Sequence, residues 1–335
     1  AVWFDEVYRR LGDRSTHVLT ARVPDCEAHD RDHANTVHRL HLYHSRWLRP
    51  ASLPVYSKFF FKGLMLGMYH RFDAIHAGRV LPEGWVAVLL GRLLRLPVVI
   101  YAHGEEITTW RRHPRRLRAM AFAYRAAAQV VANSEFTRDR LLELGVEPGR
   151  IALINPGVDL ARFHPAYEAA DLRRGLGMAP EQKLILSVGR LSRRKGFDQV
   201  IRALPALQAQ GLDVHYAIVG IGEDRDYLLS LAAELDVEER VHLLGHVSPD
   251  DLPRWYCAAD LLAMPNREVD NDTEGFGMVF VEAAACGTTA LAGEAGGTGA
   301  AVLHEQTGLR VDGAHGDAVT RALARMLSDD DLCQR

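Results

Sequence analysis

Short apolar segments alternate with helix-like segments along most of the chain, and this alternation constrains the fold more than any other feature. Strand, helix, strand repeats of this kind build parallel sheets that are covered by helices. The predicted strands of the first half are residues 17–20, 72–76, 97–101, 129–132 and 151–154.

The same alternation returns in the second half, with predicted strands at 183–188, 214–219, 241–244, 260–264, 288–292 and 309–311. Between the halves, residues 155–182 hold several Pro and Gly residues, which is typical of a hinge or linker. We therefore expect an α/β protein with two Rossmann-like domains, residues 1–165 and 166–335, whose parallel sheets face a cleft between them.

Composition agrees with two ordinary globular domains. The chain has 335 residues, of which 48% are apolar and 25% are charged; this length suffices for two cores of average size. No run of eighteen apolar residues predicts a membrane-spanning helix. Four scattered cysteines, without a Cys-x-x-Cys pair, favour reduced thiols in a cytoplasmic protein: Cys26, Cys257, Cys286 and Cys333.

A glycine-rich turn with two carboxylates stands out in residues 274–282, which read EGFGMVFVE. Gly275 and Gly277 allow the backbone to approach a ligand closely, and a helix that begins near Gly277 would direct its free N–H groups at an anion. Glu282 lies among apolar helix residues and needs a polar partner, for which sugar hydroxyls are suitable. The alternative is that Glu274 only caps the helix and Glu282 only faces solvent.

A cationic loop follows the strand predicted at 183–188. Arg190 comes directly after it, and Lys195 ends a run of three cations before a helical pattern that starts at Phe197. Open α/β sheets bind ligands at the carboxyl ends of their strands. Arg190 could hold two phosphate oxygens and Lys195 could act as a point charge on the same diphosphate, although basic loops of this kind are also common as solvated surface.

Several short motifs occur in a fixed order over nearly the whole chain. They are Ala102-His103-Gly104-Glu105, Ala132-Asn133-Ser134, Asn155-Pro156-Gly157-Val158-Asp159, Val188-Gly189-Arg190-Leu191 with Lys195-Gly196, Val219-Gly220-Ile221-Gly222, Leu244-Gly245-His246-Val247, the paired Glu274 and Glu282, and Ala292-Gly293 with Gly296-Gly297. In this order they resemble the retaining glycosyltransferases of family four, which have the two-domain GT-B fold.

The resemblance implies a role for each matching position. His103 would position the donor sugar and Glu274 would bind its hydroxyls, and these two are the expected catalytic residues. Arg190 and Lys195 would neutralise the donor diphosphate, and Glu282 would bind the ribose. The full set of implied donor-binding residues is Arg190, Lys195, Val247, Gly275, Phe276, Gly277 and Glu282, with Val247 beside the nucleobase and the backbone around Phe276 and Gly277 against sugar or phosphate.

The resemblance also implies a substrate class. A hexosyl group would pass from a nucleotide-diphosphate sugar to an acceptor hydroxyl on a lipid, sugar or small molecule, with no metal or other cofactor and no nucleic acid partner. GDP-mannose is mildly preferred, because the glycine turn and the basic first half are similar to those of bacterial lipid mannosyltransferases. UDP-glucose and UDP-N-acetylglucosamine follow closely.

Three other functions are compatible with parts of the pattern. A sugar-nucleotide epimerase of the same fold would bind a diphosphate without needing an acceptor, and a non-catalytic module would bind the nucleotide sugar without turnover. A nicotinamide dehydrogenase is suggested by Gly220-x-Gly222, but Arg225 replaces the third glycine of that fingerprint. The evenly spaced His38, His41 and His44 favour a partly exposed helical or loop face over a metal site.

Both ends of the sequence look truncated against the family pattern. Residues 2–11 predict a helix where relatives begin with a strand and a glycine loop, and the chain stops just after the helix predicted at 316–327. We therefore expect the opening strand and its loop to be missing.

Charge is distributed unevenly, which bears on the acceptor. Residues 1–165 carry 24 Lys and Arg against 16 Asp and Glu, whereas the whole chain carries 40 against 43. Aromatic residues stand beside cations at 58–65 and 110–118, a combination that suits the inner face of an anionic membrane at about 1 kcal/mol per basic residue. The alternative, core helices beside a solvated arginine face, stays open.

Overall fold

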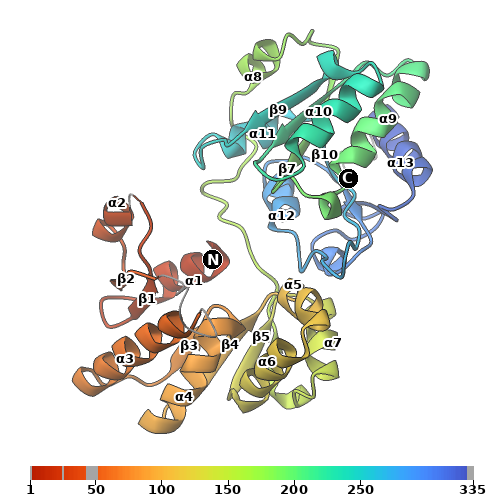
Figure 1. Ribbon diagram of the computed structural model, residues 1–335. Helices are drawn as coiled ribbons and strands as arrows, with labels where there is room; N and C mark the ends of the chain where they lie inside the picture. The colour runs from red at the N-terminus through yellow and green to blue at the C-terminus, as the bar shows by residue number, and fades with distance from the viewer. Residues whose placement is uncertain (1, 25, 43–51, 330–335) are drawn as a thin grey trace. The chain divides into compact units, whose positions relative to one another are not determined.

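The computed structural model describes residues 2–24, 26–42 and 52–329, and these form two compact units (Figure 1). The first unit takes in the chain up to residue 133 together with 137–154, and the second takes in 134–136 and the chain from 155 onward. The second unit begins earlier than the sequence-based division at 165/166, because Phe163 is buried in its core.

The first unit alternates strands and helices from its start. Its strands are β1 (His17–Ala21), β2 (Thr36–Leu40), β3 (Ile75–Ala77), β4 (Val98–Ala102), β5 (Gln129–Ala132) and β6 (Ile151–Leu153). Its helices are α1 (Val2–Leu11), α2 (Cys26–Arg31), α3 (Leu53–Tyr69), α4 (Trp85–Leu94), α5 (Glu105–Thr109), α6 (Pro114–Ala126) and α7 (Glu135–Glu143), with shorter turns η1 (Val80–Gly84), η2 (Trp110–Arg112) and η3 (Pro148–Arg150).

Parallel pairing joins these strands in two groups. β3, β4, β5 and β6 form one sheet in that order, and β1 pairs with β2 in another. Between the β1 and β3 segments lies a cavity of about 430 Å³, lined on its apolar side by Phe59 and Leu66 of α3 and by Leu90 of α4. The core of the unit lies under β4, whose Ile100 and Ala102 are fully buried.

One sequence-based expectation is wrong in this unit. His38 was expected on a helical or loop face, but it belongs to β2, where its Nε2 lies 3.0 Å from Nδ1 of His17 on the neighbouring strand. The sequence pattern did not predict this strand, because β2 has only five residues and no continuous apolar run. His41 lies in the exposed loop that follows, and His44 falls outside the described residues.

The second unit repeats the alternation around a larger sheet. Its strands are β7 (Lys183–Val188), β8 (Val214–Val219), β9 (Val241–Gly245), β10 (Leu261–Met264), β11 (Ala290–Gly293) and β12 (Gly308–Val311). Its helices are α8 (Ala170–Gly175), α9 (Phe197–Ala209), α10 (Arg225–Glu234), α11 (Leu252–Ala258), α12 (Met278–Ala285) and α13 (Gly316–Ser328), with short turns η4 (Arg193–Lys195), η5 (Glu238–Arg240) and η6 (Thr298–Ala300).

All six strands of this sheet are parallel, in the order β12-β11-β10-β7-β8-β9. The chain runs outward from β7 to β9 and then returns to the other side of β7 with β10. The strand order therefore reverses between β7 and β10, and such a switch point is where open α/β sheets bind ligands. β8 is buried along its whole length, as expected for a strand with helices on both faces.

Two groups of helices cover this sheet. α9 packs against α10 and α13, and α11 packs against α8 and α12 (Figure 1). The parallel α/β organisation predicted from the sequence is thus confirmed in both units. Among the described residues, no helix combines the length and the apolar character that crossing a bilayer requires.

Candidate active site

The loops that follow β7 and β10 lie against each other at the switch point. Gly196, which ends η4, has a positive φ of 77° and so adopts a conformation that side chains rarely tolerate. A Cβ at this position would lie 2.2 Å from the carbonyl oxygen of Pro265, just after β10. Only glycine therefore lets the cationic loop approach the loop that carries Glu274.

Glu274 is the centre of a buried charge cluster. Its Oε2 accepts hydrogen bonds from Nζ of Lys195 at 2.5 Å, from Nη1 of Arg194 at 3.0 Å and from Nδ2 of Asn266 at 3.2 Å. The Glu274 side chain is only 12% exposed. All three donors meet one oxygen, and Oε1 has no hydrogen-bond partner among the described residues, so it remains able to accept from a ligand.

The charge of Glu274 is stabilised although the group is buried. Burial by itself raises the pKa of a carboxyl, because it penalises the charged form. The positive charges of Lys195 and Arg194 outweigh this effect, and the pKa of Glu274 lies below its ordinary value. Glu274 is thus an ionised acceptor at neutral pH.

Arg194 connects this cluster to the rest of the loop. Its Nε lies 3.0 Å from Oδ2 of Asp272, while its Nη1 contacts Glu274. Its carbonyl oxygen accepts a hydrogen bond from the backbone N–H of Arg267 at 2.8 Å, and the guanidinium of Arg267 contacts both carboxylate oxygens of Asp198 at the start of α9. The two loops are therefore held together by ion pairs whose members are mostly buried, with Asp272 the exposed exception at 43%.

Arg190 has a different environment. Its side chain is 73% exposed, and it pairs with Glu223, from the loop after β8, at 3.1 Å. The structure does not bring Arg190 into the Glu274 cluster. Exposed ion pairs contribute only about 0–1 kcal/mol, so Arg190 can leave Glu223 for a ligand at little cost.

Glu282 has a partner that the sequence did not reveal. The buried hydroxyl of Tyr256, on α11, donates a hydrogen bond of 2.7 Å to Oε2 of Glu282 on α12. Burial raises the pKa of Glu282, and the bond from Tyr256 only partly opposes this rise. The Glu282 carboxyl is therefore hydrogen-bonded within the protein, and it is also the residue expected to bind the ribose hydroxyls.

The glycine turn precedes α12 as predicted. Gly277 caps the helix with a φ of 92°, and Phe276 is buried. A Cβ at Gly297 would lie 1.9 Å from the carbonyl oxygen of Gly275, and the Gly297 N–H donates to the carbonyl of Glu274 at 2.7 Å. Glycine at 297 thus allows a second backbone segment to fix the turn.

Val247 lies at the margin of the second unit. It follows the edge strand β9 and is half-buried against the main core. Glu274 follows β10, and the strands β7 and β8 lie between β10 and β9 in the sheet. Val247 is therefore two strands removed from the Glu274 cluster.

His103 belongs to the first unit, whereas the other candidate residues belong to the second. It directly follows β4, and its Nε2 donates a hydrogen bond of 2.8 Å to the carbonyl oxygen of Gly78. A neutral imidazole that donates through Nε2 has its lone pair on Nδ1. Nδ1 of His103 is therefore an acceptor that suits a hydroxyl group.

Comparison with known proteins gives the family. The family described as "Glycosyl transferases group 1" matches residues 169–335, and "Glycosyltransferase Family 4" matches residues 1–162. A GDP-mannose-dependent alpha-(1-6)-phosphatidylinositol monomannoside mannosyltransferase of Mycolicibacterium smegmatis is 34% identical over 263 residues, which cover 78% of this chain and 68% of the relative. The chain belongs to the family four glycosyltransferases.

Other relatives agree with this glycosyltransferase assignment. A D-inositol 3-phosphate glycosyltransferase of Corynebacterium glutamicum is 32% identical over 81% of this chain and 68% of its own length. The Mycobacterium tuberculosis mannosyltransferase of the same description as the first relative is 37% identical, and the match spans about half (52%) of its length.

Solved structures give the fold of the glycosyltransferase. The Anabaena protein HepE, crystallised with UDP and glucose, superposes with a TM-score of 0.79 at 22% identity, over 99% of this chain and 86% of HepE. The chain has the GT-B fold, and the resemblance drawn from its motifs is confirmed.

Sequence reasoning missed three partners of the candidate site residues, namely Asn266, Tyr256 and Asp272. Asn266 and Tyr256 bond the two glutamates, and Asp272 holds Arg194. Asn266 and Asp272 were detectable only as polar residues after a predicted strand. Tyr256 carried no signal, because it reads as one more aromatic residue of an amphipathic helix.

Proposed function

We propose that this glycosyltransferase moves mannose from GDP-mannose to a hydroxyl group of an inositol-containing acceptor, with retention of the anomeric configuration. The names of two relatives support this choice, since one is described as GDP-mannose-dependent and both as acting on inositol compounds. UDP-glucose and UDP-N-acetylglucosamine are the next candidate donors.

The state of the Glu274 carboxylate carries the proposal. Three donors fix Oε2, while Oε1 has no partner among the described residues, and the whole group lies at the switch point of the sheet. An ionised oxygen held in one orientation is a strong acceptor for hydroxyl groups. Glu274 would therefore bind the hydroxyls of the transferred sugar and orient it for attack.

Lys195 and Arg190 supply positive charge for the departing diphosphate. In the reaction the bond between the anomeric carbon and the phosphate oxygen breaks, and a bond to the acceptor oxygen forms on the same face. The acceptor's proton passes to the leaving diphosphate, whose developing charge is stabilised by Arg190, Lys195 and the N-terminus of α12. His103 would accept a hydroxyl of the donor sugar through Nδ1.

The nucleoside part would be held by the remaining residues. Glu282 would accept the ribose hydroxyls through the carboxylate that Tyr256 orients, and Val247 would lie near the base. The backbone of Gly275, Phe276 and Gly277 would face the sugar or the phosphate, because the positive φ of Gly277 turns the chain into α12 at this point.

Turnover with a panel of donors tests the proposal. The purified chain is incubated with GDP-mannose, UDP-glucose or UDP-N-acetylglucosamine, and nucleotide release is followed with and without an inositol phosphate or phosphatidylinositol acceptor. We expect release that depends on both GDP-mannose and acceptor, with the product's anomeric configuration retained by NMR. An isomerised donor without acceptor would instead identify an epimerase, and donor binding without turnover a binding module.

Single variants test the phosphate contacts. Arg190→Ala and Lys195→Ala each remove a charge-assisted contact worth roughly 1.5–3 kcal/mol, which lowers kcat/KM about ten- to a hundredfold or more. Arg174→Ala, an exposed cation on α8, is the matched control. Full turnover in both site variants would contradict the phosphate assignment, and unchanged GDP affinity in Glu282→Ala by calorimetry would contradict the ribose assignment.

We further propose that α3 docks this enzyme on an anionic membrane, where a lipid acceptor would be reached. Four large apolar side chains on this helix are exposed, namely Leu53 at 46%, Phe61 at 67%, Met68 at 68% and Tyr69 at 78%. Phe61 and Met68 are seven residues apart and so share a helix face, and Lys62 stands beside Phe61. Apolar side chains next to cations are typical of helices that lie in the membrane interface.

A further inference from the structure

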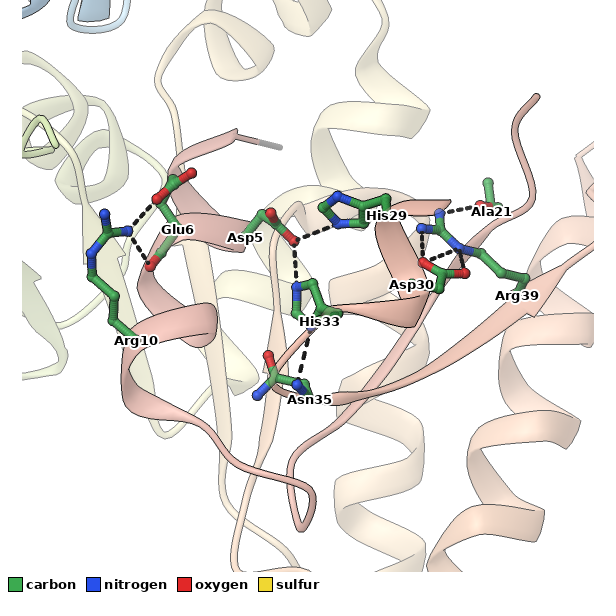
Figure 2. A network of polar contacts seen from close by, with 9 residues as sticks. All are labelled: Asp5, Glu6, Arg10, Ala21, His29, Asp30, His33, Asn35 and Arg39. Carbon is green, nitrogen blue, oxygen red and sulfur yellow. Dashed lines mark hydrogen bonds and ion pairs between the residues drawn. The ribbon is translucent and has the colours of Figure 1, made fainter. Parts of the chain in front are cut away.

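A second polar cluster lies in the first unit, apart from the residues assigned to the donor. Asp5 of α1 faces two histidines, His29 of α2 and His33 just after that helix (Figure 2). Oδ1 of Asp5 lies 3.2 Å from Nε2 of His33 and 3.8 Å from Nε2 of His29. One donor atom from each of the three side chains lies within 4.8 Å of the others.

We propose that Asp5, His29 and His33 bind one Zn²⁺ ion. Two imidazole nitrogens and one carboxylate oxygen are a ligand set that zinc commonly takes, at about 2.0–2.2 Å from each atom. Tetrahedral geometry at those lengths places neighbouring ligand atoms about 3.3 Å apart. The Asp5–His33 pair already has this separation at 3.2 Å, whereas the more exposed His29, at 3.8 Å from Asp5, must move closer.

The local fold pre-positions these ligands. His29 lies in α2, and His33 lies two residues after that helix ends at Arg31, so the chain that leaves the helix places the second histidine close to the first. His33 is buried, whereas Asp5 and His29 are about 40% exposed (36% and 42%). A buried ligand beside two accessible ones forms a half-open site, in which water completes the coordination.

The tautomer of His33 must change when zinc binds. In the structure, Nδ1 of His33 accepts a hydrogen bond of 3.1 Å from the backbone N–H of Asn35, so the ring's proton is on Nε2 and is donated to Asp5. Zinc needs the lone pair of Nε2. The neutral ring therefore moves its single proton from Nε2 to Nδ1 through water, with no net proton released.

The protonated Nδ1 then needs an acceptor, and Asn35 offers one. Oδ1 of Asn35 is buried without a hydrogen-bond partner among the described residues, although Asn35 lies directly beside His33 (Figure 2). A buried unsatisfied acceptor of this kind calls for an explanation. In the zinc-bound state it would accept from Nδ1–H, the contact that metal-bound histidines ordinarily make.

The neighbouring acid does not compete for the ion. Asp30 is occupied by the guanidinium of Arg39, whose Nε contacts both carboxylate oxygens at 2.9 and 3.2 Å. Asp5 is thus the carboxylate available to the two histidines, and the bound ion would join α1 to α2. The site is independent of the donor-binding residues, so this inference stands or falls separately from the transfer reaction.

Calorimetric titration of the chelator-treated chain with ZnCl₂ tests the proposal. We expect one ion per chain, and a loss of affinity in His29→Ala and in Asp5→Asn that exceeds the roughly 10–100-fold effect of removing an outer partner. Asn35→Ala should lose about tenfold. His113→Ala, an exposed histidine of the same unit, is the matched control and should bind like the parent.

Two further readouts separate this site from adventitious binding. At a free zinc concentration a hundred times Kd, the unfolding equilibrium constant should fall about a hundredfold in the parent and be unchanged in His29→Ala. Nitrogen NMR of the imidazoles should show the His33 proton moving from Nε2 to Nδ1 on zinc addition. Equal zinc affinity in the parent and in His29→Ala, or an unmoved His33 proton, would overturn the proposal.

Discussion

Two glutamates eight positions apart have opposite electrostatic environments. Lys195 and Arg194 lower the pKa of Glu274, whereas burial raises the pKa of Glu282. The difference follows from their neighbours, since Glu274 meets two cations and Glu282 meets a neutral phenol. Identical side chains on one turn and helix therefore affect folding stability in opposite directions at neutral pH.

Stability against pH tests this contrast. A lowered pKa stabilises the folded state above the ordinary value of 4.5, and that contribution is lost as pH falls through the folded pKa. Glu274→Gln should therefore destabilise the chain at pH 7, by roughly 3–5 kcal/mol because the buried ammonium of Lys195 loses its carboxylate partner, and by less near pH 4. A raised pKa has the opposite effect, because the ionised form of Glu282 destabilises the folded state at neutral pH. Glu282→Gln should therefore stabilise the folded chain at pH 7 and have little effect on its stability near pH 4. Urea unfolding at both pH values measures each difference, and the same sign for both variants at pH 7 would contradict the assignment.

Arg194 is predicted to act as a positioning residue. Its Nη1 donates to Glu274, and its Nε is held by Asp272. If Lys195 binds a phosphate as proposed, Arg194 would remain as the charged donor that keeps Glu274 ionised and oriented.

The pH profile of the reaction distinguishes this role from a merely structural one. Arg194→Ala should move the acid limb of kcat/KM to higher pH, because Glu274 loses a charge that lowers its pKa, and should reduce kcat about tenfold with a small change in KM for the donor. Arg194→Lys should restore much of the position of the acid limb and much of kcat. An unmoved acid limb in Arg194→Ala would show that the arginine only supports the loop.

At the scale of elements, runs of buried apolar residues made the strands of the second unit predictable. β7 and β8 match their predicted ranges, because parallel strands covered on both faces read as continuous apolar segments. β2 was not predicted, since only one short partner strand and mixed polar residues define it.

Contacts between elements were less predictable than the elements. A Cβ at Gly220 would lie 1.8 Å from the carbonyl oxygen of Gly189, and one at Gly293 would lie 1.8 Å from that of Asn266. The sequence marked these glycines as motif positions. Only the packed structure shows that they let the loops at the carboxyl ends of adjacent strands cross.

At the scale of the whole molecule, the number of units and their α/β type followed from the sequence, and the site followed in part. Charged residues at motif positions could be predicted as ligand contacts, because charge at the carboxyl end of a strand rarely serves to stabilise the fold. Partners such as Asn266 and Tyr256 could not, because a hydrogen bond between distant segments leaves no local pattern in the chain.

The excess of positive charge in the first half allows a test of the membrane contact proposed for α3. The chain should sediment with vesicles that contain anionic lipid at low salt, and detach as salt screens the attraction. Phe61→Ser and Met68→Ser should each weaken binding about tenfold or more, through the lost burial of a large apolar side chain. Leu229→Ser, which removes an exposed leucine (40%) of the second unit, is the control. Absence of the chain from anionic vesicles at low salt would rule out this surface.

The pairing of Lys195 with Glu274 has a consequence for selectivity. Under the role proposed for Lys195, a carboxylate tethered to the same protein is an intramolecular competitor for every incoming phosphate, at a high effective concentration. Inorganic phosphate could displace that carboxylate from Lys195, but it would supply no hydroxyl groups to bind the carboxylate in place of the lysine. A nucleotide sugar would provide hydroxyl groups that bind Glu274 in place of the lysine, so under this role the site would favour a nucleotide sugar over small anions.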